Sequence, residues 1–163
     1  MEATCAVLDA SGAIGLAKGG CLLNLPRLFP KCLMPPLAVA EVIDPVSREA
    51  LESALRLWLV VESARTEVYN SAPPLRSVPD RHVVALALTH PGAVIISGDR
   101  RLTNAARREG IPVLTAPDTV KLLAEQGIIA AAKPCLDLMT ELGFGMRADE
   151  YAAVLKALGE PLD

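Results

Sequence analysis

The sequence predicts an α/β protein, a three-layer α/β/α domain with a central, mainly parallel twisted sheet. Short apolar runs typical of buried strands alternate with longer segments in which apolar residues recur at helical spacing. Proline and glycine clusters separate these segments along 163 residues, a length typical of one domain. The hydrophobic fraction is 52% while Phe, Trp and Tyr contribute 3%, so we expect a core of Ala, Val, Ile and Leu between sheet and helices.

Five elements are predicted before Pro45. An apolar run that stops at Asp9 is the first strand, and Ser11 opens a segment with helical spacing. A glycine pair and a proline pair bound the next short helix and strand. Pro36 begins a helix that carries Glu41, because proline is tolerated in a first helical turn. These elements are expected at 4–8, 12–18, 22–29, 31–34 and 36 to about 45.

Two further strands are predicted in the middle of the chain. A run of helix formers is followed by a β-type run that begins at Trp58. Residues 71–79, with three prolines, are predicted to be a loop that ends on Asp80. An apolar helical face follows, and then a buried strand that leads to Gly98 and Asp99. These elements are expected at 47–57, 58–61, 80 to about 91 and 93–97.

Helices dominate the remainder of the predicted chain. We expect helices and one short strand at 102–109, 112–114 (the strand), 118–126, 128–142 and 148–158. Strands that alternate with helices favour a parallel sheet with right-handed crossovers and helices on both faces. We predict that residues 1–130 form the core and that 131–163 form a C-terminal helical extension packed on the same domain.

Composition excludes several classes of protein. The formal charge of −3 does not indicate a nucleic-acid binder, although a carboxylate-rich site would itself lower the net charge. The four cysteines form no Cys-x-x-Cys pair and no histidine stands at zinc-ligand spacing, so we expect them to be reduced. The N-terminus has no basic region, and no stretch approaches the roughly 20 apolar residues of a membrane span. We therefore expect a soluble, cytoplasmic protein.

Four acidic residues fall at or near strand-to-helix junctions, where α/β proteins place their sites. Asp9, Glu41, Asp80 and Asp99 are predicted to converge at one edge of the sheet. Taken singly, Asp9 and Asp80 suit helix N-caps, Asp99 a turn and Glu41 a solvated helix position. Their combination favours one shared site. Hard cations such as Mg²⁺ or Mn²⁺ prefer such oxygen ligands.

The four acids stand in the motifs Asp9-Ala10-Ser11, Pro35-Pro36 followed by Glu41, Asp80-x-x-Val83-x-Ala85-x-Ala87, and Ser97-Gly98-Asp99. Together these motifs resemble the PIN-domain family, best known through the VapC-type toxins of toxin–antitoxin pairs. The tail at 136–160, with its Gly-Phe-Gly turn and closing Gly-Glu, resembles a PIN-like subfamily of uncharacterised function. That subfamily often has a second acidic residue at the position of Gly98 and a glutamate where Asp80 stands, so the number of bound metals stays open.

The resemblance implies a divalent-metal-dependent ribonuclease that hydrolyses RNA phosphodiester bonds and is the toxin of a toxin–antitoxin pair. It implies Asp9 and Asp99 as principal ligands of Mg²⁺ or Mn²⁺, with Glu41 and Asp80 binding directly or through water. The implied partners are RNA, a cognate antitoxin and a second copy of the chain in a homodimer.

Neighbouring polar residues have a role under the same interpretation. Ser11 and Ser97 are candidates to orient the carboxylates, or else are an ordinary helix cap and strand end. Arg100 and Arg101 are candidates for phosphate contact, and a solvated surface is the equally weighted alternative.

Two other functions compete with this interpretation. A non-catalytic PIN-like module that binds RNA or protein is the more serious, because a fold does not establish an activity. A haloacid-dehalogenase-type phosphatase fits poorly, since Ser11 and Thr103 stand where that class needs aspartates.

Overall fold

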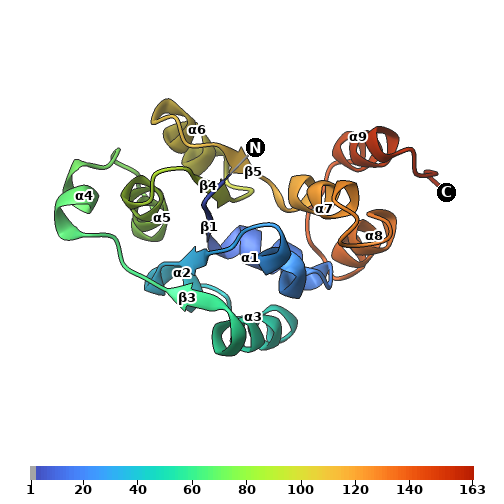
Figure 1. The fold of residues 1–163 in the computed structure, drawn as a ribbon, viewed down its shortest axis with the longest axis horizontal. Coiled ribbons are helices and arrows are strands. Elements are labelled where there is room, and N and C mark those ends of the chain that lie inside the picture. The colour runs from blue at the N-terminus through green and yellow to red at the C-terminus, as the bar shows by residue number, and fades with distance from the viewer. Residues whose placement is uncertain (1–2) are drawn as a thin grey trace.

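Five parallel strands form the central sheet of the computed structural model, which describes residues 3–163. Their order across the sheet is β3-β2-β1-β4-β5, so β1 lies at the centre (Figure 1). Helices flank the sheet, which confirms the predicted three-layer α/β/α fold. Within the described part of the chain, no helix has the length and apolar character needed to cross a bilayer. The strands are β1 (Cys5–Leu8), β2 (Cys32–Met34), β3 (Leu59–Val61), β4 (Ala93–Ile96) and β5 (Val113–Leu114).

The helices form two groups, each centred on one helix. The first group is α1 (Ala10–Lys18), α3 (Pro45–Leu57), α7 (Ala116–Glu125) and α8 (Lys133–Glu141), in which α1 contacts the other three. The second is α2 (Pro36–Ala40), α4 (Thr66–Ser71), α5 (Val78–Thr89) and α6 (Arg100–Arg108), in which α5 contacts the other three. Right-handed crossovers explain why α1 and α3 fall in one group and α5 and α6 in the other, because the direction of winding reverses between β1 and β4.

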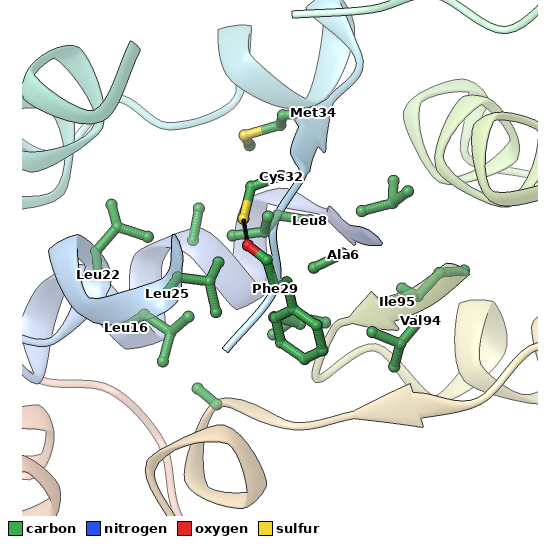
Figure 2. Packing of buried hydrophobic residues seen from close by; sticks show 14 of the residues in the cluster. Ala6, Leu8, Leu16, Leu22, Leu25, Phe29, Cys32, Met34, Val94 and Ile95 are labelled. Atoms are coloured by element: carbon green, nitrogen blue, oxygen red, sulfur yellow. Dashed lines mark hydrogen bonds between the residues drawn. The ribbon is translucent and has the colours of Figure 1, made fainter. Parts of the chain in front are cut away.

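Aliphatic side chains fill the space between sheet and helices, as the composition predicts. Leu16 of α1 meets Leu22 and Leu25 of the 3₁₀ helix η1 (Leu22–Arg27), and all three are buried (Figure 2). Every residue of β1, β2 and β4 is buried as well. Strands with both faces covered have near-continuous apolar sequences, which is why these runs showed no alternation. The four cysteines are free thiols.

Two sequence predictions about helix ends were wrong, and one helix was missed. The helix predicted from Asp80 begins two residues earlier, at Val78, because Ser77 is its N-cap and Pro79 is tolerated in the first turn. Asp80 is therefore not the N-cap. Pro45 does not end a helix but begins α3, behind the N-cap Asp44. Helix α4 was not predicted at all; its six residues bury no side chain and so lack the apolar periodicity that predicts helices.

The predicted helix at 128–142 was also wrong, because α8 begins only at Lys133. Gly127 adopts a left-handed φ of 70° and ends α7. The Gly127 and Ile128 amides then donate to the Ala124 and Leu123 carbonyls, the pattern of a Schellman motif. The apolar residues after Gly127 follow this C-cap and do not continue a helix.

The start of α8 is capped by a residue from the far end of the chain. Its own N-cap position, Ala132, offers no side-chain acceptor. The Glu160 carboxylate accepts hydrogen bonds from the amides of Ala132 at 2.7 Å and Lys133 at 3.0 Å. Glu160 reaches them because α9 (Ala148–Leu158) ends at Gly159, whose φ is 70°. This contact joins the two C-terminal helices.

Replacing Glu160 by alanine is expected to lower the free energy of unfolding by about 1–2 kcal/mol, the cost of losing a helix cap. Urea denaturation measures this change, and hydrogen exchange at the Ala132 and Lys133 amides should accelerate. Asp163→Ala, an exposed acidic residue three positions further on, is the matched control and should leave stability unchanged. Equal stability of the two variants would contradict the capping role.

Candidate functional site

The ends of β1 and β4 lie side by side where the strand order reverses. In the parallel register Leu8 is opposite Ile96, so the chain segments that begin at Asp9 and Ser97 leave the sheet next to each other. Ligand sites of open α/β sheets occur at such reversal points. A pocket of about 420 Å³ opens there. Its lining residues are Asp9, Ala10, Ser11, Ile14, Glu41, Ser77, Asp80 and Asp99.

Asp9 is the most deeply placed of these residues, with 4% of its surface exposed. It is the N-cap of α1, and its Oδ1 accepts a hydrogen bond from the Gly12 amide at 2.7 Å. The Ser11 hydroxyl lies 2.8 Å from the same oxygen and 3.0 Å from Oδ2. The Ser97 hydroxyl donates to Oδ2 at 2.5 Å. These donors hold the carboxylate in one orientation at the base of the pocket.

The two serines also connect Asp9 to the loop after β4. Ser11 Oγ accepts a hydrogen bond from the Gly98 amide at 2.9 Å, and Ser97 Oγ accepts one from the Asp99 amide at 3.0 Å. Each hydroxyl therefore accepts from one backbone amide and donates to Asp9. This arrangement fixes the position of Asp99 relative to Asp9, although 90 residues separate them in the chain.

Three helix N-termini meet at the pocket. Asp99 is the N-cap of α6 and accepts from the Leu102 amide at 2.8 Å. Asp80 lies in the first turn of α5, where its amide donates to Ser77 Oγ at 3.3 Å. Because helix N-termini carry partial positive charge, they stabilise the carboxylates gathered beside them.

Glu41 occupies a different kind of position. The helix predicted to extend to about residue 45 ends at Ala40, so Glu41 is the C-cap of α2 and does not lie within the helix. Its side chain is exposed at the rim of the pocket. It is therefore the carboxylate with the greatest freedom to move.

Sequence reasoning did not include Ser77, which lines the pocket and caps α5. The signal was present, because Ser77-Val-Pro-Asp80 has the Ser-x-x-Asp spacing of a helix N-terminus. Arg100 and Arg101 follow Asp99 directly, yet neither lines the carboxylate pocket. Both arginine side chains are exposed.

Burial, together with neighbouring negative charge, raises the pKa of three carboxylates of the pocket. For Asp80 the pKa rises from 3.8 to about 6, mainly through burial and then through the charges of Asp99 and Asp9. Burial also raises the pKa of Asp9, against the hydrogen bonds from Ser97, Gly12 and Ser11 that lower it. Burial and the charge of Asp80 raise the pKa of Glu41. The pocket therefore concentrates negative charge at an energetic cost.

The raised pKa of Asp80 predicts a pH-dependent stability. Its pKa is higher in the folded than in the unfolded protein, so its contribution is most favourable below about pH 4 and is lost as pH rises through about 6. In EDTA, the Tm should fall across this interval, and Asp80→Asn should reduce the fall. Scanning calorimetry from pH 4 to 7 measures both proteins. Equal pH dependence in the two would contradict this assignment.

The lining suits a divalent cation in its chemistry. It offers carboxylate and hydroxyl oxygens, and no lysine, arginine or histidine of the described chain lines it to neutralise the four acids. Between residues 3 and 163, however, no three acidic, histidine or cysteine side chains gather closely enough to hold one ion by themselves. Mg²⁺ characteristically retains several waters and uses one or two carboxylates, so this pocket suits a partly hydrated ion better than a closed protein cage.

Similar solved structures include two PIN-type proteins. A PilT N-terminus domain protein from the hyperthermophilic archaeon Sulfolobus solfataricus P2 is 17% identical, with a TM-score of 0.48 and 88% of this chain and 97% of that chain covered. The PIN domain endonuclease Utp24 is 16% identical, with a TM-score of 0.49, and the match covers 68% of this chain and 84% of that chain. No curated protein sequence matches the chain.

A family model gives the assignment. The model of DUF3368, described as a PIN domain, matches residues 5–160, from the first strand to the residue that caps α8. PIN domains are commonly nucleases, which agrees with a carboxylate-lined pocket at the reversal point of the sheet. The chain belongs to the PIN-domain family.

Proposed function

We propose that this protein is a divalent-metal-dependent ribonuclease that hydrolyses RNA phosphodiester bonds. The observation that carries the proposal is the pocket itself, in which four carboxylates converge and no basic residue of the described chain neutralises them. Gathering like charges destabilises a fold, and the raised pKa values of Asp9 and Asp80 reflect that cost. Such a cluster therefore indicates a functional site. A bound cation would relieve that repulsion.

Asp9 and Asp99 are the proposed principal ligands of Mg²⁺ or Mn²⁺. Both are fixed through the hydroxyls of Ser11 and Ser97, which orient Asp9 and hold the Asp99 backbone. Asp80 would bind from the first turn of α5, directly or through water. Glu41, exposed at the rim, would join in the same way.

A divalent ion in this pocket would neutralise charge on the phosphate and make water a stronger nucleophile near neutral pH. In the proposed reaction water attacks phosphorus in line, and the bond from phosphorus to the 3′ oxygen breaks. The products are a 3′-hydroxyl and a 5′-phosphate. The acidic residues of the pocket would orient the reactants. The apolar side chain of Ile14 forms part of the wall of the same pocket.

Cleavage of a mixed-sequence single-stranded RNA by purified protein tests the proposal. We expect cutting with Mn²⁺ or Mg²⁺ and none in EDTA, with 5′-phosphate ends on the products. The absence of cutting by folded protein across a mixed-sequence RNA pool in either metal would count against the proposal.

Metal binding should also stabilise the fold, independently of cleavage. An ion present at a hundredfold excess over its Kd adds about 2.7 kcal/mol, which corresponds to a Tm increase of about 5–10 °C. Differential scanning fluorimetry with Mn²⁺, Mg²⁺ or EDTA measures the shift. A matched experiment on Asp99→Asn should show a much smaller shift.

The proposed cellular role is that of the toxin in a toxin–antitoxin pair, acting in the cytoplasm on RNA. Induced expression in a bacterial host should arrest growth, and Asp9→Asn should remove the arrest. Co-expression of the product of an adjacent gene that encodes a small DNA-binding protein should restore growth and yield a complex. Size-exclusion chromatography with light scattering tests the proposed homodimer.

A non-catalytic PIN-like module that binds RNA or protein is the second candidate, and one observation favours it. Both oxygens of Asp9 already accept hydrogen bonds from Ser11, Ser97 or the Gly12 amide. If these bonds persist in solution with metal present, Asp9 is a structural cap. A metal-independent RNA affinity, without a Tm shift or cleavage, would favour this candidate.

A further inference from the structure

A second hollow, which we call the basic groove, lies between α6 and the loop before α5. Its volume is about 690 Å³, within the range of pockets that hold small ligands. One wall comes mainly from α6, and the other from Ser71 at the end of α4 and the loop at residues 72–76. The lining residues are Ser71, Ala72, Pro73, Pro74, Leu75, Arg76, Arg101, Asn104, Ala105, Arg108 and Glu109.

The basic groove adjoins the carboxylate pocket through both of its walls. On the loop side, Arg76 lines the groove and the next residue, Ser77, lines the pocket. On the helix side, Asp99 lines the pocket and Arg101 lines the groove. Consecutive Cα atoms are about 3.8 Å apart, so a chain-like ligand could pass from one hollow into the other.

The charge of the basic groove is opposite to that of the carboxylate pocket. Three arginines against one glutamate line it, although the whole chain carries a formal charge of −3. Arg101 and Arg108 lie seven residues apart on the face of α6 that also carries Asn104. None of the ion pairs between residues 3 and 163 involves Arg76, Arg101 or Arg108. All three side chains are exposed and available to a ligand.

The loop wall is held in place from behind. The Arg81 guanidinium of α5 donates to the carbonyls of Asn70 and Ala72, each at 3.3 Å. It also lies 4.6 Å from the centre of the Tyr69 ring, a cation–π contact. Within the loop, the side chain of Ala72 is buried. The groove is therefore a formed feature of the fold, in which a fixed wall of prolines, Leu75 and Arg76 faces the arginines of α6.

We infer that the basic groove binds the phosphate backbone of single-stranded RNA beside the scissile bond. Guanidinium groups match phosphate oxygens in geometry and charge, and Asn104 adds a neutral polar group between them. The prolines opposite offer an apolar surface to the sugars and bases. Arg101 lines the basic groove, whereas Arg100 does not. The inference rests on the proposed ribonuclease function for its ligand.

The test is RNA binding in EDTA, where no cleavage is expected. The test protein carries Arg76→Gln, Arg101→Gln and Arg108→Gln; the matched control carries Arg56→Gln, Arg107→Gln and Arg147→Gln, which are exposed arginines outside the groove. Fluorescence anisotropy with a labelled 12-nucleotide RNA gives affinity at several salt concentrations. Circular dichroism and the Tm confirm that both proteins fold.

The slope of log affinity against log salt is negative, and removing one arginine–phosphate interaction should reduce its magnitude by about 0.7. The same loss should weaken binding roughly fivefold at 0.1 M salt. We expect the magnitude of the slope to fall by about 2 in the test protein, and the slope of the control to match that of the wild type. Equal reductions in test and control proteins, or no reduction in either, would overturn the inference. Because the assay needs no catalysis, its outcome is separate from metal-dependent cleavage: an unchanged slope with intact cutting rejects the groove alone.

Discussion

Asp9→Asn and Asp99→Asn are each expected to reduce metal-dependent RNA cleavage by more than about 100-fold. Loss of a residue that merely orients a metal ligand typically costs 10–100-fold, and these two residues are the proposed ligands themselves. Asparagine caps helices about as well as aspartate, so the Gly12 and Leu102 amides keep an acceptor. The substitutions therefore remove a charge and leave the fold in place.

Asp44→Asn is the matched control for both variants. Asp44 is likewise an N-cap aspartate, accepting from the Ser47 amide at 3.0 Å, but it does not line the carboxylate pocket. Single-turnover cleavage with Mn²⁺ should proceed at the wild-type rate in this variant. Retention of activity in Asp9→Asn or Asp99→Asn would sink the ligand assignment, and loss of activity in Asp44→Asn would show that helix caps in general matter.

Gly12→Ala is expected to have the largest effect on stability, lowering the free energy of unfolding by about 3 kcal/mol. A Cβ atom at this position would lie 2.2 Å from the Ile96 carbonyl oxygen and 2.8 Å from the carbonyl carbon. These are backbone atoms at the end of strand β4, next to the central strand β1, and they cannot rotate away as a side chain could. The first turn of α1 would have to move off the sheet.

Urea denaturation measures this loss, with Gly145→Ala as the control. A Cβ at Gly145 would meet no atom within 4 Å, and its φ is not positive. The control should therefore be as stable as the wild type. Because Gly12 also donates to Asp9, Gly12→Ala should weaken the metal-induced Tm shift in parallel. A stability close to that of Gly145→Ala would mean that α1 does not contact β4 this closely.

The fold was predictable where local pattern and tertiary structure agree. The buried runs that end at Asp9 and Asp99 were correctly interpreted as strands, and the strict apolar content of β1 and β4 follows from their burial on both faces. Parallel pairing then brings the strand ends together without further information. The order of the strands was not predicted, because any pairing of buried parallel strands satisfies the same apolar pattern.

The starts of α3 and α5 had local N-cap signals in Asp44 and Ser77 that were overlooked, but other errors arose where a distant residue contributes to a local structure. The start of α8 depends on Glu160, 28 residues from Ala132, and no pattern around residue 132 records that contact. The division into a core at 1–130 and an extension at 131–163 stays a prediction; α8 and α9 both pack on α7. Arg101 was a candidate for phosphate contact, but the groove itself was not predicted, since Arg76 and Arg101 are distant in sequence and only the fold brings them to facing walls.

The hydrogen bond from Ser97 to Asp9 spans 88 positions in the sequence. Contacts of such long range form late, because a large loop must close before they contribute. A ribosome that has synthesised β1, β2 and β3 has therefore made a chain that holds Asp9 and Glu41 but lacks Asp80 and Asp99. If the protein cuts RNA as proposed, we expect it to spare its own message until the segments that carry Asp80 and Asp99 have been made.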